Sequence, residues 1–244
     1  MIAALALMAA TAAAPIPLQI ADRATWTISR VQSYRAEGGG KVQEWTLKTE
    51  KRLTWRRGRR GAPDVLVVTP VATTTEGEGV LKIMASARTF PEPARITVTE
   101  RLTPIALIDA VAVRRSLEKR GASLDDAVID RAAIAMIGAE LFVIGRVQGA
   151  ALPGDESRVF DAPVVGPLSA SGALAKTSLT LHSRDPAAGH AIVDWKQVLD
   201  QSSAPEGMFQ EITCRHRIDL RTGFVTRADC TTSAIVGMGP DAVK

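Results

Sequence analysis

The stretch from Ile212 to Thr232, ITCRHRIDLRTGFVTRADCTT, decides the fold expected of this 244-residue chain. Two runs of alternating apolar and polar residues flank the tripeptide Arg221-Thr222-Gly223. A period of two is typical of half-buried β-strands, and a short loop that ends in glycine joins such strands as a hairpin. On the first arm, the face expected to be buried carries Ile212, Cys214, His216, Ile218 and Leu220.

The loop also predicts how the two arms pair. With a three-residue loop, Leu220 lies opposite Phe224, and counting outward places Cys214 opposite Cys230 on the buried face. Opposed residues on neighbouring strands lie about 4.5–5.5 Å apart at Cα, which is within reach of a disulfide. We therefore predict a Cys214–Cys230 disulfide. The alternative is a pair of buried free thiols that act as small apolar side chains.

Residues 1–21 carry no charge and begin with an apolar run to Ala14 that is too short to span a bilayer. Ala12, Ala13 and Ala14 are small residues of the kind found at signal cleavage sites, although the usual preceding basic residues are missing. We expect a signal peptide or N-terminal apolar segment, and a periplasmic or secreted protein. The alternative is a buried N-terminal helix. Export also favours the disulfide, because reducing compartments disfavour one.

The composition is that of an ordinary globular protein, with 46% hydrophobic residues. The net charge of +4 is modest for this length and gives no argument for a nucleic-acid partner. No later apolar segment is long enough for a membrane span, so we expect none in the mature chain.

Two long stretches near the N-terminus alternate in the manner of strands. In residues 25–35, Trp26, Ile28 and Arg30 share one face. From Val42 onward, one parity carries an apolar and aromatic set in which Lys51 is the lone exception. This second stretch predicts a long strand with an aromatic inner face and a charged outer face. The inner set is Trp45, Leu47, Thr49, Leu53 and Trp55.

The middle of the chain is the part expected to be helical. Asp109 is a fair N-cap for a helix over 110–120, and a second apolar stripe at helical spacing follows Ser123 up to Gly138. Residues 141–148 read as a strand. The predicted fold class is α+β: one or two curved, half-barrel-like antiparallel sheets with two central helices. Residues 22–244 then form a single domain, with two β-meander halves (22–108 and 140–236) around helices 109–138.

A basic turn follows the second strand. It contains Arg56, Arg57, Arg59 and Arg60. One interpretation is a contact for anionic lipid head groups or other anionic surfaces. The alternative, which we favour, is a solvated hairpin tip, because no aromatic stacking platform accompanies the charges.

No catalytic or metal-binding motif is evident in the sequence. The three histidines His182, His190 and His216 do not share a ligand spacing, so we expect no metal and no cofactor. A hydrolase would have to assemble its site from dispersed residues such as Ser169, His182 and Asp194. We therefore lean towards a protein that is not an enzyme, without excluding this alternative.

The hairpin Asp219-Leu220-Arg221-Thr222-Gly223-Phe224 is similar to one in many uncharacterised bacterial exported or periplasmic proteins of the domain-of-unknown-function type. The order of elements resembles that of the half-barrels of periplasmic lipoprotein- and lipid-carrier families. This resemblance implies a non-catalytic envelope protein that binds a hydrophobic small molecule, a lipid or an envelope partner. The residues expected to line such a site are Trp45, Trp55 and Trp195, for which ordinary core packing is the alternative. A further alternative is a structural interaction module that contacts anionic surfaces.

Overall fold

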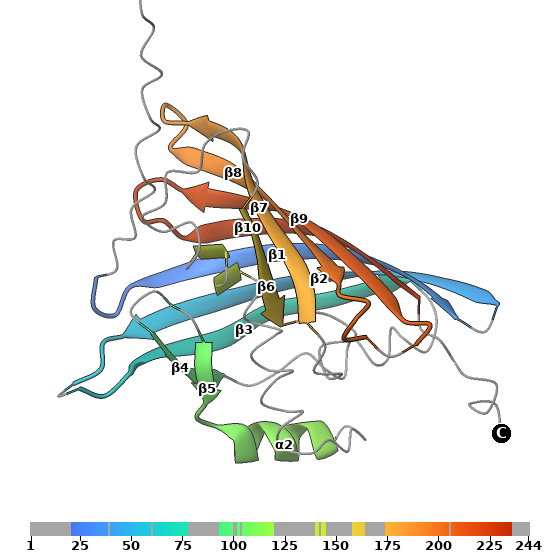
Figure 1. Cartoon of the computed structure of the whole chain (residues 1–244). Coiled ribbons are helices and arrows are strands. Elements are labelled where there is room, and N and C mark those ends of the chain that lie inside the picture. The colour runs from blue at the N-terminus through green and yellow to red at the C-terminus, as the bar shows by residue number, and fades with distance from the viewer. Residues whose placement is uncertain are drawn as a thin grey trace, which may run out of the picture.

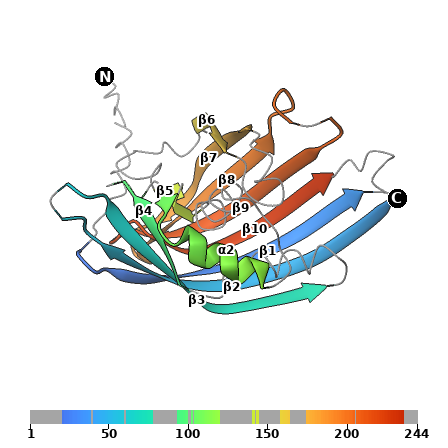
Figure 2. The same ribbon diagram turned by 90° about the horizontal axis from the view of Figure 1, so that it is seen from below.

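The computed structural model describes residues 21–38, 40–59, 61–77, 93–99, 102, 104–119, 140–141, 143–144, 158–163, 174–204 and 206–235. Within these residues the chain is mainly β, and all the strands join into one twisted, curved sheet (Figures 1 and 2). In chain order the elements are β1 (Thr25–Gly38), β2 (Lys41–Arg56), β3 (Asp64–Gly77), β4 (Ala94–Val98), β5 (Pro104–Leu107), α2 (Ala110–Glu118), β6 (Arg158–Pro163), β7 (Leu174–Asp185), β8 (His190–Leu199), β9 (Phe209–Asp219) and β10 (Val225–Ile235).

The sheet consists of two meanders joined through β1 and β10. Its ten strands lie in the order β5-β4-β3-β2-β1-β10-β9-β8-β7-β6. Strands β1 and β10 pair in parallel from Ser29↔Arg227 to Glu37↔Ile235, and every other neighbouring pair is antiparallel. The predicted antiparallel pairing is thus found at every junction but one, and the sheet is mixed because its first and last strands in the described chain, β1 and β10, pair in parallel.

The β9–β10 hairpin confirms the predicted register at its cysteines. Cys214 lies opposite Cys230 and the two form a disulfide. The turn itself differs from the prediction, because the backbone N–H of Asp219 donates to the carbonyl of Phe224, which leaves four residues in the loop instead of three. A register shift between Val225 and Arg227 compensates for the extra loop residue. Gly223 has a φ of 76°, the left-handed conformation that its place in the turn predicted.

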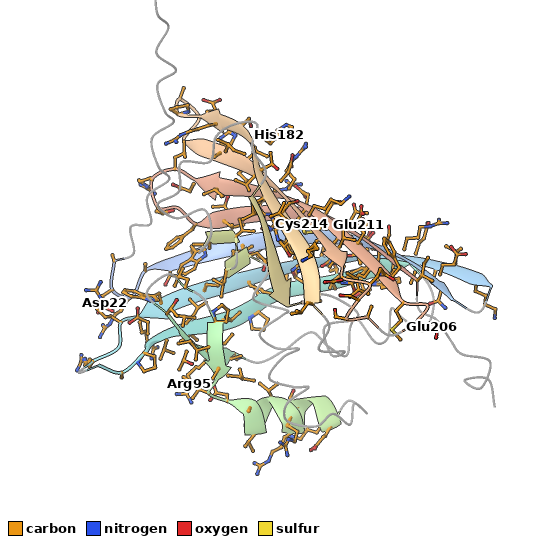
Figure 3. The ribbon with its side chains drawn as sticks, in the orientation of Figure 1. Asp22, Arg95, His182, Glu206, Glu211 and Cys214 are labelled. Atoms are coloured by element: carbon orange, nitrogen blue, oxygen red, sulfur yellow. A yellow bond between two sulfur atoms is a disulfide. The ribbon has the colours of Figure 1, made fainter. Side chains whose placement is uncertain are left out.

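The prediction of two central helices is wrong as a description of the fold class. Among the described residues, α2 is the one continuous helix. Its Val111 is exposed, whereas Val113 is buried in the core. Arg95 on β4, which is labelled in Figure 3, ties the start of this helix to the sheet by donating to the carboxylate of Asp109. The stripe expected over 123–138 lies outside the described residues.

Residues 140, 141, 143 and 144 are helical, where a strand over 141–148 was predicted. A short apolar run that is buried on all sides has the same sequence pattern in a helix and in a strand, which explains the error. No helix in the described part of the chain is long and apolar enough to cross a membrane.

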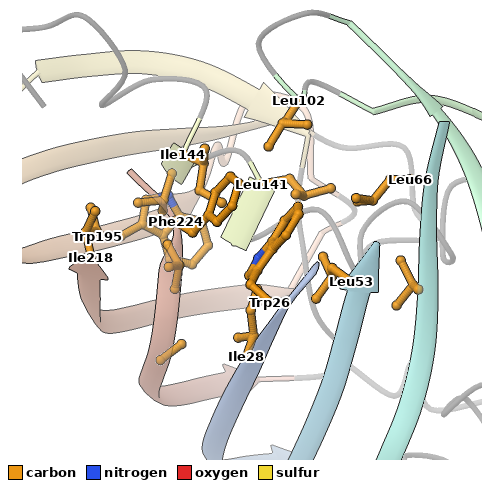
Figure 4. Packing of buried hydrophobic residues seen from close by; sticks show 14 of the residues in the cluster. Trp26, Ile28, Leu53, Leu66, Leu102, Leu141, Ile144, Trp195, Ile218 and Phe224 are labelled. Carbon is orange, nitrogen blue, oxygen red and sulfur yellow. The ribbon is translucent and has the colours of Figure 1, made fainter. Parts of the chain in front are cut away.

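We call the face of the sheet that carries Trp26, Trp55 and Trp195 the inner face. Its side chains form one apolar cluster that draws on strands as distant in the sheet order as β4 and β7. Figure 2 shows that the sheet curves around this face. Leu141 and Ile144 lie among these side chains and are almost completely buried (Figure 4). We call the described helical residues 140, 141, 143 and 144 the helical segment, and this segment lies on the inner face against the cluster formed by both meanders.

Candidate functional site

The middle of the inner face is charged, although apolar side chains surround it. Arg30 on β1 lies beside Thr49 of β2 on one side and beside Ala228 of β10 on the other. Ala228 in turn lies opposite His216 of β9. Arg30, Ala228 and His216 thus lie side by side on three neighbouring strands, with the small alanine in the middle.

Glu140, from the helical segment, completes this arrangement. Its Oε1 lies 3.1 Å from Nη1 of Arg30, and the two side chains are only 4% and 11% exposed. Lys51 is partly buried on the neighbouring strand β2, close enough for its charge to act on Glu140. We call Arg30, Lys51, Glu140 and His216 the charge cluster.

Burial and mutual attraction compete in the charge cluster. Burial alone would raise the pKa of Glu140, but the positive charges of Arg30 and Lys51 outweigh it and hold that pKa below its ordinary value. Burial lowers the pKa of Lys51, and Glu140 offsets part of that change. The ion pairs therefore keep a carboxylate charged in a place where an isolated carboxyl group would be neutral.

His216 is completely buried, and neither of its ring nitrogens has a hydrogen-bond partner within the described structure. Burial lowers its pKa to about 4, although the carboxylate of Glu140 opposes the change. The imidazole is therefore neutral near pH 7, and the indole of Trp195 packs against it edge to face, with ring centroids 6.2 Å apart. A buried polar group without a partner is costly, and it is the kind of feature that calls for a functional explanation.

The histidine also lies beside the disulfide. Ligand atoms of Cys214, His216 and Cys230 fall within 4.8 Å of one another, and this is the one cluster of possible metal donors in the described residues. Both sulfur atoms are committed to the disulfide, however, and a thiolate is the form that binds zinc. In its oxidised form this group of residues is therefore not a metal site.

Further unpartnered N–H donors point into the same face. The indole Nε1 atoms of Trp26, Trp45 and Trp55 and the Nε of Arg30 are buried without a hydrogen-bond partner in the described structure. An indole nitrogen and a guanidinium nitrogen can only donate. Apart from His216, the unpartnered buried polar atoms that the structure describes on the inner face are thus all donors.

The three tryptophans predicted to line a site all lie on the inner face, but not together. Trp55 and Trp195 belong to the main apolar cluster. Trp45 lies outside it, stacked on Tyr34 at a centroid distance of 4.6 Å. The fourth tryptophan, Trp26, was not among the predicted lining residues, and it stacks on Phe224 at 3.9 Å.

The basic turn is exposed, as a solvated hairpin tip would be. Arg56, Arg57 and Arg59 are exposed, while Arg60 lies outside the described residues. The guanidinium of Arg57 lies 5.3 Å from the centre of the Trp55 ring, so it also covers the end of the inner face. The turn therefore contributes to packing as well as to surface charge.

Two of the three residues considered for a hydrolase do meet. His182 Nδ1 lies 3.0 Å from Oδ2 of Asp194, whose other oxygen accepts a bond of 2.9 Å from Arg215. These side chains are 40–55% exposed on the outer face of the sheet. Ser169 lies outside the described residues. Exposed charge networks of this kind are common on sheet surfaces and contribute little to stability.

Sequence reasoning missed Arg30, Lys51 and Glu140 as site residues. The signal for the first two was present, because each is a cation at a position whose parity assigns it to the apolar face. The signal for Glu140 was absent, since its partner Arg30 is 110 residues away. No family model, curated protein or solved structure matches this chain.

Proposed function

We propose that this chain is a non-catalytic protein of the bacterial envelope that binds a molecule with a long apolar chain on the inner face of its sheet. The observation that carries the proposal is the combination of an apolar and aromatic face with buried N–H groups that have no partner. Trp26 and Trp55 supply both features within one side chain. An apolar surface with a few polar groups aimed into it is typical of small-molecule binding sites.

Two further observations support this proposal over a hydrolase. The histidine on the inner face is neutral at pH 7 and lies beside a disulfide instead of a nucleophile. The pair His182–Asp194 lies exposed on the outer face, where nothing in the described structure shields a reaction from water. The disulfide also supports export, because it persists in oxidising compartments.

The test uses the tryptophans themselves. The chain has four, and all of them are buried on the inner face. Bromine atoms quench indole fluorescence at short range, so dibromostearic acid and its methyl ester report directly on whether an alkyl chain reaches this face. We expect saturable quenching by at least one of the two probes.

Two controls make the result specific. Trp195→Phe removes a reporter in the main cluster, and Trp45→Phe removes the reporter outside it. The change in quenching between the two variants shows which part of the inner face the alkyl chain contacts. A folded, disulfide-bonded protein that neither probe quenches would rule out the proposed function.

A further inference from the structure

We propose that the ligand is an amphiphile with one anionic group, and that Arg30, Lys51 and His216 bind that group, with Glu140 holding the same place when no ligand is bound. This inference rests on the proposed function and specifies its ligand class. The chemistry is that of a carboxylate on an alkyl chain, as in a long-chain fatty acid.

The first argument is the balance of donors and acceptors. Arg30 donates to Glu140 through Nη1, while its Nε–H has no partner in the described structure. A guanidinium often binds a carboxylate through two parallel bonds, and Nε together with an Nη atom is one pair of donors that can form them. Glu140 thus accepts from only one of the N–H donors of Arg30, and a ligand carboxylate can accept from the unpartnered Nε–H as well.

The second argument is the neighbouring histidine. His216 is completely buried, is separated from Arg30 by only Ala228, and has both nitrogens unpartnered in the described residues. One nitrogen of a neutral imidazole carries a proton and donates. Ala228, which lies between them in the register, has a small side chain, so the two donors lie on either side of the least bulky position in this row.

The third argument is where the charges lie relative to the apolar surface. Trp26 and Leu53 are paired neighbours on β1 and β2 and lie on the same face as the charge cluster. On the other side of the cluster, Gln32 donates to Thr232, so the face becomes polar there. An alkyl chain can therefore lie on the apolar side with its acid at Arg30.

Glu140 then acts as an internal competitor. It is carried by the helical segment that covers the inner face, and its carboxylate supplies the charge that the ligand would otherwise supply. A ligand carboxylate that binds Arg30 therefore competes with Glu140 for the same guanidinium group.

The test compares acid and ester in paired variants. In the unaltered protein we expect dibromostearic acid to bind about tenfold more tightly than its methyl ester, since hydrogen bonds to charged groups are the stronger ones. The double variant R30M/E140Q removes both charges of the buried pair together and should bring the two affinities close to equality. E140Q alone should strengthen binding of the acid and leave the ester unchanged.

The outer face offers a matched control. Arg35 on β1 and Glu44 on β2 form an exposed pair at 2.8 Å, so R35M/E44Q removes the same charges without touching the inner face. This variant should keep the tenfold preference for the acid. K51M, which leaves the buried pair intact, should lower the preference.

Each remaining outcome decides against the inference. Equal binding of acid and ester to the unaltered protein would overturn it while leaving the proposed function in place, whereas no quenching by either probe would remove both. A preference for the acid that survives in R30M/E140Q would place the anionic group elsewhere. Competition by acetate as strong as that by the long-chain acid would show a small-anion site instead of an amphiphile site.

Discussion

Strand β1 contributes the arginine of two arginine–glutamate pairs, one on each face of the sheet. Arg35 and Glu44 on the outer face are 56% and 65% exposed, and water competes for both charges. Arg30 and Glu140 on the inner face are 11% and 4% exposed, so each depends on the other for its solvation. The same two residue types thus form a dispensable surface contact in one place and a mutually dependent buried pair in the other. This difference is the reason that we place the proposed binding site on the inner face.

The largest expected effect comes from removing one partner of the buried pair. R30M leaves the Glu140 carboxylate buried without its counterion and should lower the free energy of unfolding by about 3–5 kcal/mol. R35M, its counterpart on the outer face, should change it by at most about 1 kcal/mol. Urea unfolding followed by tryptophan fluorescence measures both.

The same experiment has an internal check. R30M/E140Q should recover most of the stability that R30M loses, because no buried charge is left uncompensated. Equal costs for R30M and R35M would mean that the inner pair is as well solvated as the outer one, and the comparison would fail.

The next effect concerns the cross-strand pairs of the β9–β10 hairpin. Cys214 and Cys230 are 16 residues apart, and replacing both by alanine should cost about 3 kcal/mol of stability, as expected for a loop of that size. Thr213 and Thr231 are the neighbouring pair on the outer face, and replacing both by alanine should cost about 1 kcal/mol or less. Urea midpoints of the two double variants test this order. A smaller loss of stability for the cysteine variant than for the threonine variant would contradict it.

The smallest effect appears only on acidification. His216 has a pKa of about 4 in the folded protein, below the ordinary value of 6.5. The unfolded chain therefore binds the proton first as the pH falls, and stability declines between pH 6.5 and 4. From pH 7 to pH 5 the loss attributable to this histidine should be roughly 2 kcal/mol.

H216F should flatten that part of the stability profile, while T213A on the outer face, which removes no titratable group, should leave it unchanged. The charges that act on His216 are those of Glu140, Arg30, Asp194 and Asp229, and none of them is altered in either variant. An identical acid slope in H216F and the unaltered protein would assign the slope to other groups.

Local features of this fold could be read from its sequence. The alternation of residues 212–232 and the glycine at 223 predicted the hairpin, the Cys214–Cys230 register and the disulfide. Each of these features depends only on two consecutive strands and the turn that joins them. The loop length was wrong by one residue because the compensating irregularity near Thr226 leaves no mark in an alternating pattern.

Long-range features could not be read in this way. The parallel pairing of β1 with β10 joins residues about two hundred positions apart, and neither strand carries a sign of its partner. Arg30 and Lys51 were visible as interruptions of apolar patterns, but their meaning depends on Glu140, which arrives from a segment read as the border of a strand. The sequence thus showed two cations at apolar positions, but it did not show that Glu140 lies beside them.

Native mass spectrometry of the chain secreted from bacteria and purified without detergent tests the central claim most directly. We predict that the folded protein carries an extra mass equal to that of a long-chain acid, which is lost on denaturation, and that R30M/E140Q carries less of it than R35M/E44Q. A folded protein that shows the same mass before and after denaturation, and that takes up no acid when incubated with it, would contradict the account.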